Sequence, residues 1–457
     1  MSKIFGKLIF FSISLLMVSV AIRAQSPSPY PNAVTDRLIH EETPMAPMPV
    51  NMVFNDPDFG SPMVRVTDQT TDFRNPGSYV RTAALGAANE WSIDGSKFYV
   101  VGAGNQELAF GFDPSTMAIG SLPGAQPGRG LLLPLRAGST FSFVDPDFIY
   151  GTTSSKPLTI TGYRFSTATS STVLDTTTCG TQPPLVPSRS VVSDDDVTLS
   201  SDDSRVVISE GGPQSGKHMF VIVYDKNLGC RWYNTQTGQI GGQWGSSGQA
   251  SAPHPYLIRH TSISGDGKYV RIEVNHFGSY FWNVESLAVV ACGEKEGIEC
   301  GGYGTIGNHS YVNSPGLIDQ MNILIRPINK LNDYSQLVYP LVPPYHFGQE
   351  KHFVWTDGYF DDSNPVCGSN YNYEGDTEID APYDGEIWCM ETDGLASTVW
   401  RFAHNRAAWI APFFNTQPLG NMTADGRWFL FTSTWDSQLG VDSKGNPRSD
   451  VWIVNLD

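Results

Sequence analysis

One short phrase recurs along the chain and constrains its fold more than any other feature. It consists of a short strand, a tight turn of the Asp-Gly type, and a second strand of aromatic or β-branched residues. The four clear copies turn at Asp94-Gly95, Asp202-Asp203, Asp266-Gly267 and Asp425-Gly426. Asp-Gly suits a tight hairpin because glycine tolerates a positive φ and aspartate hydrogen-bonds its own backbone. The repeat therefore predicts a series of similar β-hairpins.

Weaker copies at residues 144–150, 313–316 and 354–358 bring the series to seven. Repeats of this kind predict an all-β fold, a single β-propeller of about seven four-stranded blades, with six or eight blades as alternatives. The composition agrees, with 45 Gly, 31 Pro and 12% aromatic residues against only 16% charged residues. A disordered chain or a helical bundle has the opposite balance.

The recurring phrase resembles the TolB-type (PD40-like) propeller repeat, in which a strand follows Ser-Pro-Asp-Gly. The resemblance covers residues 85–457, although no copy in this chain has the complete Ser-Pro-Asp-Gly. It implies a propeller ring and says little about activity, because propellers host many chemistries.

The two ends of the predicted ring suggest how it closes. Residues 451–457 read as the third strand of a blade, after which the sequence stops. Residues 61–68 read as a strand without a blade of its own. We therefore predict that an N-terminal strand completes the last blade and removes the open edge, so that the propeller spans residues 61–457. The alternative is that 61–68 merely precedes the first blade.

The N-terminus has the pattern of a secretory signal peptide. Lys3 and Lys7 precede an uncharged apolar run over 8–21, and small residues follow it. The run is too short to span a bilayer comfortably. We predict a signal peptide over 1–24, a secreted or periplasmic protein, and no membrane span in the mature chain; an uncleaved anchor is the alternative. Residues 25–60 are rich in proline and predict an extended leader.

Six cysteines in an exported chain favour disulfides. Six allow fifteen pairings, of which we expect neighbours to pair. The expected bonds are Cys179–Cys230, Cys292–Cys300 and Cys367–Cys389.

The formal net charge of −17 opposes a nucleic-acid partner, which requires a basic face. A glycan or another extracellular ligand is the expected partner.

Residues that precede the innermost strand of a blade tend to line one mouth of the central channel. Counting back from each turn places one polar residue per blade there: Asn89 with its neighbour Glu90, Asp196, His260, His309, His352 and Gln417. Histidine is both a common metal ligand and the usual acid or base near neutral pH. The alternative is that these residues only cap strands.

Cationic and aromatic neighbours extend this predicted site, namely Arg259, Tyr311, His404 and Arg406. This combination suits β-elimination from a uronic acid, in which a cation neutralises the carboxylate and a base removes the C5 proton. Expected catalytic residues are Arg259, His260, His309, Tyr311 and Arg406, and expected substrate-binding residues are Asn89, Glu90, Asp196, His404 and Gln417.

Gln349 and His352 look like the Gln-x-x-His part of the metal-binding pattern of oligogalacturonate lyases, whose next histidine is Val354 here. The resemblance implies a divalent metal ion held by Gln349, His352 and His309. It also implies a lyase-like, carbohydrate-active propeller. The alternative function is a non-catalytic propeller that binds a protein or a glycan.

Overall fold

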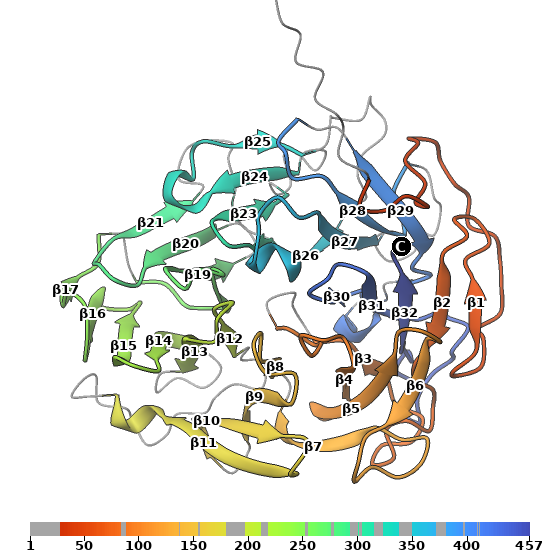
Figure 1. Cartoon of the computed structure of the whole chain (residues 1–457), viewed down its shortest axis with the longest axis horizontal. Coiled ribbons are helices and arrows are strands. Elements are labelled where there is room, and N and C mark those ends of the chain that lie inside the picture. Colours follow the sequence, from red (N-terminus) through yellow and green to blue (C-terminus); the bar gives the residue numbers. More distant parts are fainter. Residues whose placement is uncertain are drawn as a thin grey trace, which may run out of the picture.

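The computed structural model describes residues 28–83, 88–136, 138–153, 156–179, 197–211, 218–251, 255–275, 278–292, 300, 304–314, 323–337, 350–371, 381–395, 398–408, 410 and 412–457. In these residues the strands form seven antiparallel sheets, arranged as blades around a ring (Figure 1). The predicted all-β, seven-bladed propeller is confirmed. Inner strands such as β8, β12, β26 and β30 lie nearest the centre of the ring (Figure 1).

The first four blades take up the chain from residue 80 to residue 292. Blade 1 comprises β3 (Val80–Arg81), β4 (Lys97–Gly102), β5 (Gln106–Asp113), β6 (Ala118–Ser121) and β7 (Leu131–Arg136). Blade 2 comprises β8 (Thr140–Phe141), β9 (Phe148–Thr153), β10 (Lys156–Arg164) and β11 (Thr169–Asp175). Blade 3 comprises β12 (Thr198–Leu199), β13 (Arg205–Gly211), β14 (His218–Asp225), β15 (Gly229–Asn234), β16 (Gln239–Gly242) and β17 (Gly248–Gln249). Blade 4 comprises β18 (His260–Ile263), β19 (Tyr269–Asn275), β20 (Gly278–Asn283) and β21 (Val289–Cys292).

The other three blades complete the ring. Blade 5 comprises β22 (Thr305–Ile306), β23 (Ser310–Asn313), β24 (Leu324–Pro327) and β25 (Ser335–Gln336). Blade 6 comprises β26 (Glu350–Val354), β27 (Val366–Tyr371), β28 (Glu386–Met390) and β29 (Val399–His404). Blade 7 comprises β30 (Gly420–Met422), β31 (Trp428–Ser433), β32 (Asp450–Asn455), β2 (Pro62–Arg65) and β1 (Val53–Asn55). The helices described are short 3-10 turns: η1 (Thr176–Thr178), η2 (Ile328–Lys330), η3 (Asp357–Tyr359) and η4 (Phe414–Thr416).

The recurring Asp-Gly phrase forms the turn between the first two paired segments of its blade. Gly95, Gly267 and Gly426 have φ values of 67°, 72° and 71°, the left-handed region that glycine adopts without steric cost. The preceding aspartate accepts a backbone hydrogen bond from the residue after the glycine, as Asp266 does from Lys268 at 3.0 Å. It also accepts one from the Ser264 hydroxyl at 2.6 Å. Local side-chain chemistry therefore defines the repeat.

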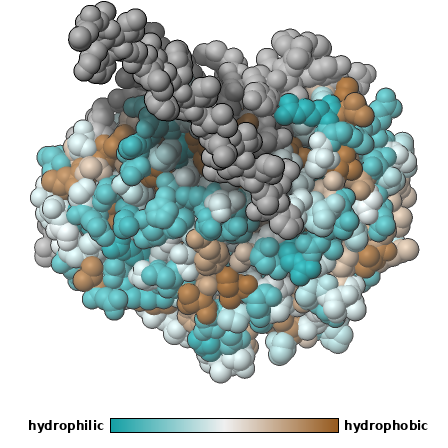
Figure 2. Space-filling model, turned by 45° about the horizontal axis from the view of Figure 1, so that its top comes forward, coloured by the Kyte–Doolittle hydropathy of each residue, from teal (hydrophilic) through white to brown (hydrophobic). Residues whose placement is uncertain are grey.

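Most strands are buried on both faces, because each blade is covered by its two neighbours. All residues of β31, for example, are buried, and its sequence WFLFTS is almost continuously apolar. The side chains between blades 3 and 4 form one such contact layer, which includes Val207, Tyr233, Ile263 and Trp282. In the view of Figure 2, the coloured outer surface is predominantly hydrophilic, with hydrophobic side chains in small groups.

An N-terminal strand closes the ring, as predicted. In blade 7, β2 pairs with β32 in the register Met63↔Val454, Val64↔Ile453 and Arg65↔Trp452. The outermost strand, β1, then pairs with β2 and comes from the stretch predicted as an extended leader. The last blade is therefore built from both ends of the described chain (Figure 1).

The segment before β1 lies along the outer strand of blade 6. Val34 and Arg401 exchange two backbone hydrogen bonds, of 3.2 and 2.9 Å. The Arg401 guanidinium donates to Asp36 Oδ1 at 2.9 Å and to the Leu38 carbonyl at 2.8 Å. The leader is thus held by specific contacts between residues far apart in the sequence.

Three disulfides join Cys179–Cys230, Cys292–Cys300 and Cys367–Cys389, and these are the three predicted pairings. The first links the end of blade 2 to blade 3, and the last joins directly opposed residues of β27 and β28. The predicted signal peptide, residues 1–24, lies outside the described residues. In the part of the chain that is described, no helix has the length and apolar character needed to cross a membrane.

Candidate functional site

His260 lies where the prediction placed it, at the start of an inner strand. It is the first residue of β18, half-buried, and it pairs with Glu273 of β19. The turn at Asp266-Gly267 lies at the opposite end of the same two strands. His260 therefore marks the end of the propeller ring away from the Asp-Gly turns, where the channel mouth was predicted, and we keep that name for it.

The neighbouring Arg259 belongs to a small charged group. Its Nη1 donates to Glu273 Oε1 at 3.0 Å, and Arg271 Nη2 donates to Glu273 Oε2 at 2.8 Å. Glu273 and Arg271 are buried, whereas about a quarter of the Arg259 side chain is exposed (26%). Two guanidinium groups thus share the Glu273 carboxylate at the mouth.

His352 joins this group from blade 6. It is buried in β26, and its ring stacks on Tyr371 with centroids 5.6 Å apart. Burial, followed by the positive charge of Arg259, lowers the pKa of His352 to about 3, while a hydrogen bond with the Gln417 side chain acts in the opposite direction. Arg259, His352 and Gln417, from blade 4, blade 6 and the approach to blade 7, thus lie close enough to influence one another.

Because His352 is buried in its neutral form, acid should destabilise the fold through it. Below pH 6.5 the unfolded chain takes up a proton at this histidine, whereas the folded protein does so only near pH 3. The free energy of unfolding is therefore unaffected by His352 above pH 6.5 and falls as the pH drops from 6.5 toward about 3. We expect the free energy of unfolding, measured with urea between pH 7 and pH 5, to fall less steeply in His352→Gln. One proton accounts for a slope of at most about 1.4 kcal/mol per pH unit. An equal slope in the wild type and in His352→Gln would contradict this prediction.

The structure corrects the predicted placement of His309. It follows the inner strand β22 and lies in the turn before β23, with 64% of its side chain exposed. Its ring nitrogens lie 3.7 Å from Asp266 and 3.8 Å from Asp362, which belong to the first turns of blades 4 and 6. His309 is therefore at the end of the propeller opposite the channel mouth. Counting back from the predicted turn at 313–316 gave the wrong position, because Asn313 is the last residue of β23. The turn between β22 and β23 is at residues 307–309, which contain no Asp-Gly.

Tyr311 is a core residue in this structure. Its ring is buried between blades 4 and 5, where it packs against Phe281, and its hydroxyl donates to the Cys300 carbonyl at 3.2 Å. Burial raises its pKa further above the ordinary tyrosine value, which makes it a poor base. The predicted catalytic role of Tyr311 would require a side chain that reaches the channel, whereas this one is buried between blades.

Two of the residues predicted to bind substrate, Asn89 and Glu90, are buried and bonded to the backbone. The Asn89 side chain donates to the Phe141 carbonyl at 3.4 Å, and Glu90 accepts a hydrogen bond from the Ala83 amide. Gln417 is buried near His352, as described above. Asp196 and Gln349 lie outside the described residues.

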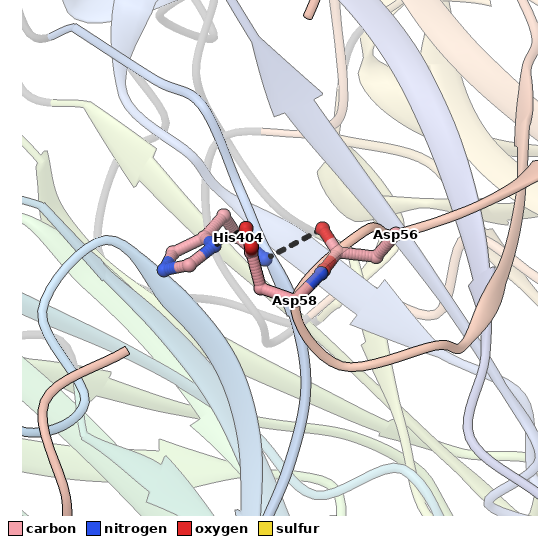
Figure 3. Close-up of side chains that lie close together, drawn as sticks. All are labelled: Asp56, Asp58 and His404. Carbon is pink, nitrogen blue, oxygen red and sulfur yellow. Dashed lines mark hydrogen bonds and ion pairs between the residues drawn. The ribbon is translucent and has the colours of Figure 1, made fainter. Parts of the chain in front are cut away.

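His404 and Arg406 lie elsewhere than predicted. They lie at the end of β29, the outer strand of blade 6, of which His404 is the last residue. The turn between β1 and β2 packs against this end of the strand. His404 forms a group with Asp56 and Asp58 of that turn, and one donor atom from each residue lies within 4.8 Å of the others (Figure 3). Among the described residues, this is the only group of three or more such side chains close enough to hold a metal ion.

The Asp56–Asp58–His404 group is built by a tight turn. Asp56 Oδ1 accepts the amides of Asp58 and Phe59 at 3.0 and 2.9 Å, and its Oδ2 accepts the His404 amide at 3.2 Å (Figure 3). The Nδ1 atom of His404 lies 3.1 Å from Asp58 Oδ2. Asp56 and His404 are buried, and Asp58 is nearly so.

Other carboxylates crowd the same region. Glu42 Oε1 lies 2.9 Å from Arg406 Nη1, and Asp436 Oδ2 lies 3.8 Å from it. Burial raises the pKa of Glu42 to about 8. The nearby Arg406 lowers this pKa, and the negative charge of Asp436 raises it. Burial also raises the pKa of Asp56. Asp56 and Asp58 are the most buried carboxylates of the region, whereas 37% of the Asp436 side chain is exposed.

The sequence reasoning missed Asp56, Asp58 and Glu42 because all three lie in the stretch taken as a leader. The available signal was the pair of aspartates in Asp56-Pro57-Asp58, directly before the strand predicted to close the ring. Nothing in the sequence placed that pair next to His404, which lies more than 340 residues later.

Comparison with solved structures supports the fold. An oligogalacturonate lyase from Vibrio parahaemolyticus is 14% identical, with a TM-score of 0.53 over 89% of this chain and 96% of that chain. An oligogalacturonate lyase in complex with manganese is also 14% identical, with a TM-score of 0.55 and the same coverage. No protein-family model matches the sequence, and no curated protein matches it. At this identity the likeness concerns the propeller fold alone.

The geometry thus offers two candidate sites with different chemistry. The channel mouth combines a partly exposed cation with imidazoles, an arrangement suited to an anionic ligand and to proton transfer. The Asp56–Asp58–His404 group presents oxygen and nitrogen donors and suits a divalent cation.

Proposed function

We propose that the chain is an extracytoplasmic, carbohydrate-active propeller that cleaves uronic-acid-containing glycans by β-elimination at the channel mouth. The observation that carries the proposal is the convergence of Arg259, His352 and Gln417 at one end of the channel, beside the half-buried His260. The resemblance of the fold to oligogalacturonate lyases supports the choice of substrate class. The three disulfides and the predicted signal peptide support export.

In the proposed reaction, Arg259 pairs with the substrate carboxylate and thereby lowers the barrier to loss of the C5 proton. His260 takes that proton, the C5 electron pair forms a C4–C5 double bond, and the glycosidic oxygen leaves C4 and takes up a proton. Arg259 is suited to this role because its guanidinium lies at the mouth and about a quarter of its side chain is exposed. A local charge of this kind acts within about 10 Å, where the net charge of −17 is largely screened by salt.

The chemistry at the mouth is carried by the residues of this chain. The manganese of the solved lyase complex suggests a metal, but the described residues there do not form a donor set of three. Val354 stands where the lyase pattern has a histidine, and His309 lies at the opposite end of the propeller.

A panel of uronate polymers tests the proposal, with ultraviolet absorbance of the unsaturated product as the measurement. We expect Arg259→Gln and His260→Ala each to lower kcat/KM by about 100-fold. Lys268→Gln serves as the control, because Lys268 lies on the exposed turn at the other end of β18 and β19 and contacts Asp266. Equal activity in all three variants would place the chemistry elsewhere.

The alternative function is glycan binding without catalysis. It is favoured by the ion pair that already engages Arg259 and by the burial of His352. Under this alternative, no polymer yields an unsaturated product, while Arg259→Gln still weakens glycan binding measured by calorimetry.

A further inference from the structure

We propose that Asp56, Asp58 and His404 form a structural site for one divalent transition cation, such as Mn²⁺ or Zn²⁺, that locks the N-terminal closure of the ring. The site is separate from the channel mouth and does not depend on the proposed function. It joins the turn between β1 and β2 of blade 7 to the last residue of β29 in blade 6 (Figure 3).

The orientation of the His404 ring is the first argument. Its Nε2 atom lies 3.0 Å from the His40 carbonyl oxygen, an acceptor, so Nε2 carries the proton and donates it. In the neutral ring, the lone pair of Nδ1 then points at Asp58 Oδ2, 3.1 Å away. Two acceptors at this distance require a cation between or beside them, either a proton or a metal ion. A metal-binding histidine typically donates its other ring nitrogen to a carbonyl or a carboxylate in this manner.

The balance of charge is the second argument. Four carboxylates, those of Glu42, Asp56, Asp58 and Asp436, surround Arg406 and the ring of His404. Asp56 and Asp58 are the most buried of the four, and Arg406 lies 4.0 Å from Asp58 but pairs more closely with Glu42, at 2.9 Å. Buried carboxylates without a close counter-charge are costly, and a divalent cation supplies that counter-charge.

The donor spacing also suits a metal. An ion with ligand distances of about 2.1 Å holds its donors about 3.0 to 4.2 Å apart. The His404–Asp58 pair already has this separation, and the third donor lies within 4.8 Å, so it needs to move by less than about 1 Å. One imidazole nitrogen with two carboxylate oxygens favours Mn²⁺ or Zn²⁺ over Ca²⁺, which prefers oxygen alone.

Metal titration of the full-length protein, stripped with EDTA and then desalted, tests this proposal. We expect one equivalent of Mn²⁺ or Zn²⁺ to bind by calorimetry, with Ca²⁺ binding much more weakly. At about one hundred times the dissociation constant, the metal should raise the thermal midpoint by about 2–5 °C. Asp58→Asn and His404→Gln should each weaken binding by at least about 100-fold.

His309→Gln is the matched control, because His309 is also flanked by two aspartates but is exposed and lies farther from them. It should bind one equivalent with wild-type affinity. If either metal-site variant fails to fold, the titration of the wild type, with hydrogen exchange of residues 43–60 before and after metal addition, still decides. Absence of binding, binding without added protection of that segment, or equal weakening by His309→Gln would overturn the proposal.

Discussion

Replacing Val64 with aspartate is expected to prevent the ring from closing and to leave little folded protein. Val64 is the middle residue of β2 that pairs with β32, and it is fully buried. Its side chain packs in the cluster between blades 7 and 1, with Trp428, Ile453 and Val100. A carboxylate in this apolar layer has no partner, so we expect a loss of at least about 4 kcal/mol in the free energy of unfolding.

Val53→Asp is the matched control for this experiment. Val53 is the direct partner of Val64 across β1 and β2, but it is substantially exposed (43%). We expect it to change the free energy of unfolding by less than about 0.5 kcal/mol. Urea unfolding followed by tryptophan fluorescence measures both variants. Similar midpoints for Val64→Asp and Val53→Asp would show that β2 does not close the ring.

The second large effect is expected from Arg401→Met, which breaks a buried ion pair. Arg401 is fully buried, its Nε donates to Glu386 Oε2 at 2.7 Å, and Glu386 is also buried. Methionine retains much of the side-chain volume but leaves the Glu386 carboxylate without its counter-charge. Removal of one partner from a buried pair costs about 3–5 kcal/mol.

Arg401→Met should also loosen the N-terminal segment, because Arg401 holds Asp36 and Leu38. Limited proteolysis should therefore cut near residues 36–40 before the blades unfold. The double variant Arg401→Met with Glu386→Gln should recover part of the lost stability, since no unpaired charge remains. The exposed pair Arg427–Asp457 is the comparison, and Arg427→Met should cost less than about 1 kcal/mol. An equally small loss for Arg401→Met would contradict this account.

The candidate site was only partly predictable. His260 and His352 were counted back from the turns, and both lie in inner strands, β18 and β26. Blade 6 turns through the 3-10 segment η3 rather than through an Asp-Gly hairpin. The count failed for His309, because blade 5 uses a different turn and the count began at the wrong hairpin. Tyr311 and Arg406 have suitable chemistry, but their burial and partners make them structural. Residue type alone does not distinguish a channel side chain from one between blades.

By itself, the sequence determined the repeated hairpins, and from them it predicted the number of blades, the neighbouring disulfide pairs and the strand that closes the ring. The hairpins depend on interactions a few residues apart, as at Asp266 with Ser264 and Lys268. Only the tertiary structure shows that the N-terminal segment pairs with the outer strand of blade 6 and that Asp56 and Asp58 lie beside His404. Those contacts join residues 346 to 348 positions apart. They exist because closure of the ring brings the two ends of the chain into one blade, and no local pattern in the sequence records which side chains then become neighbours.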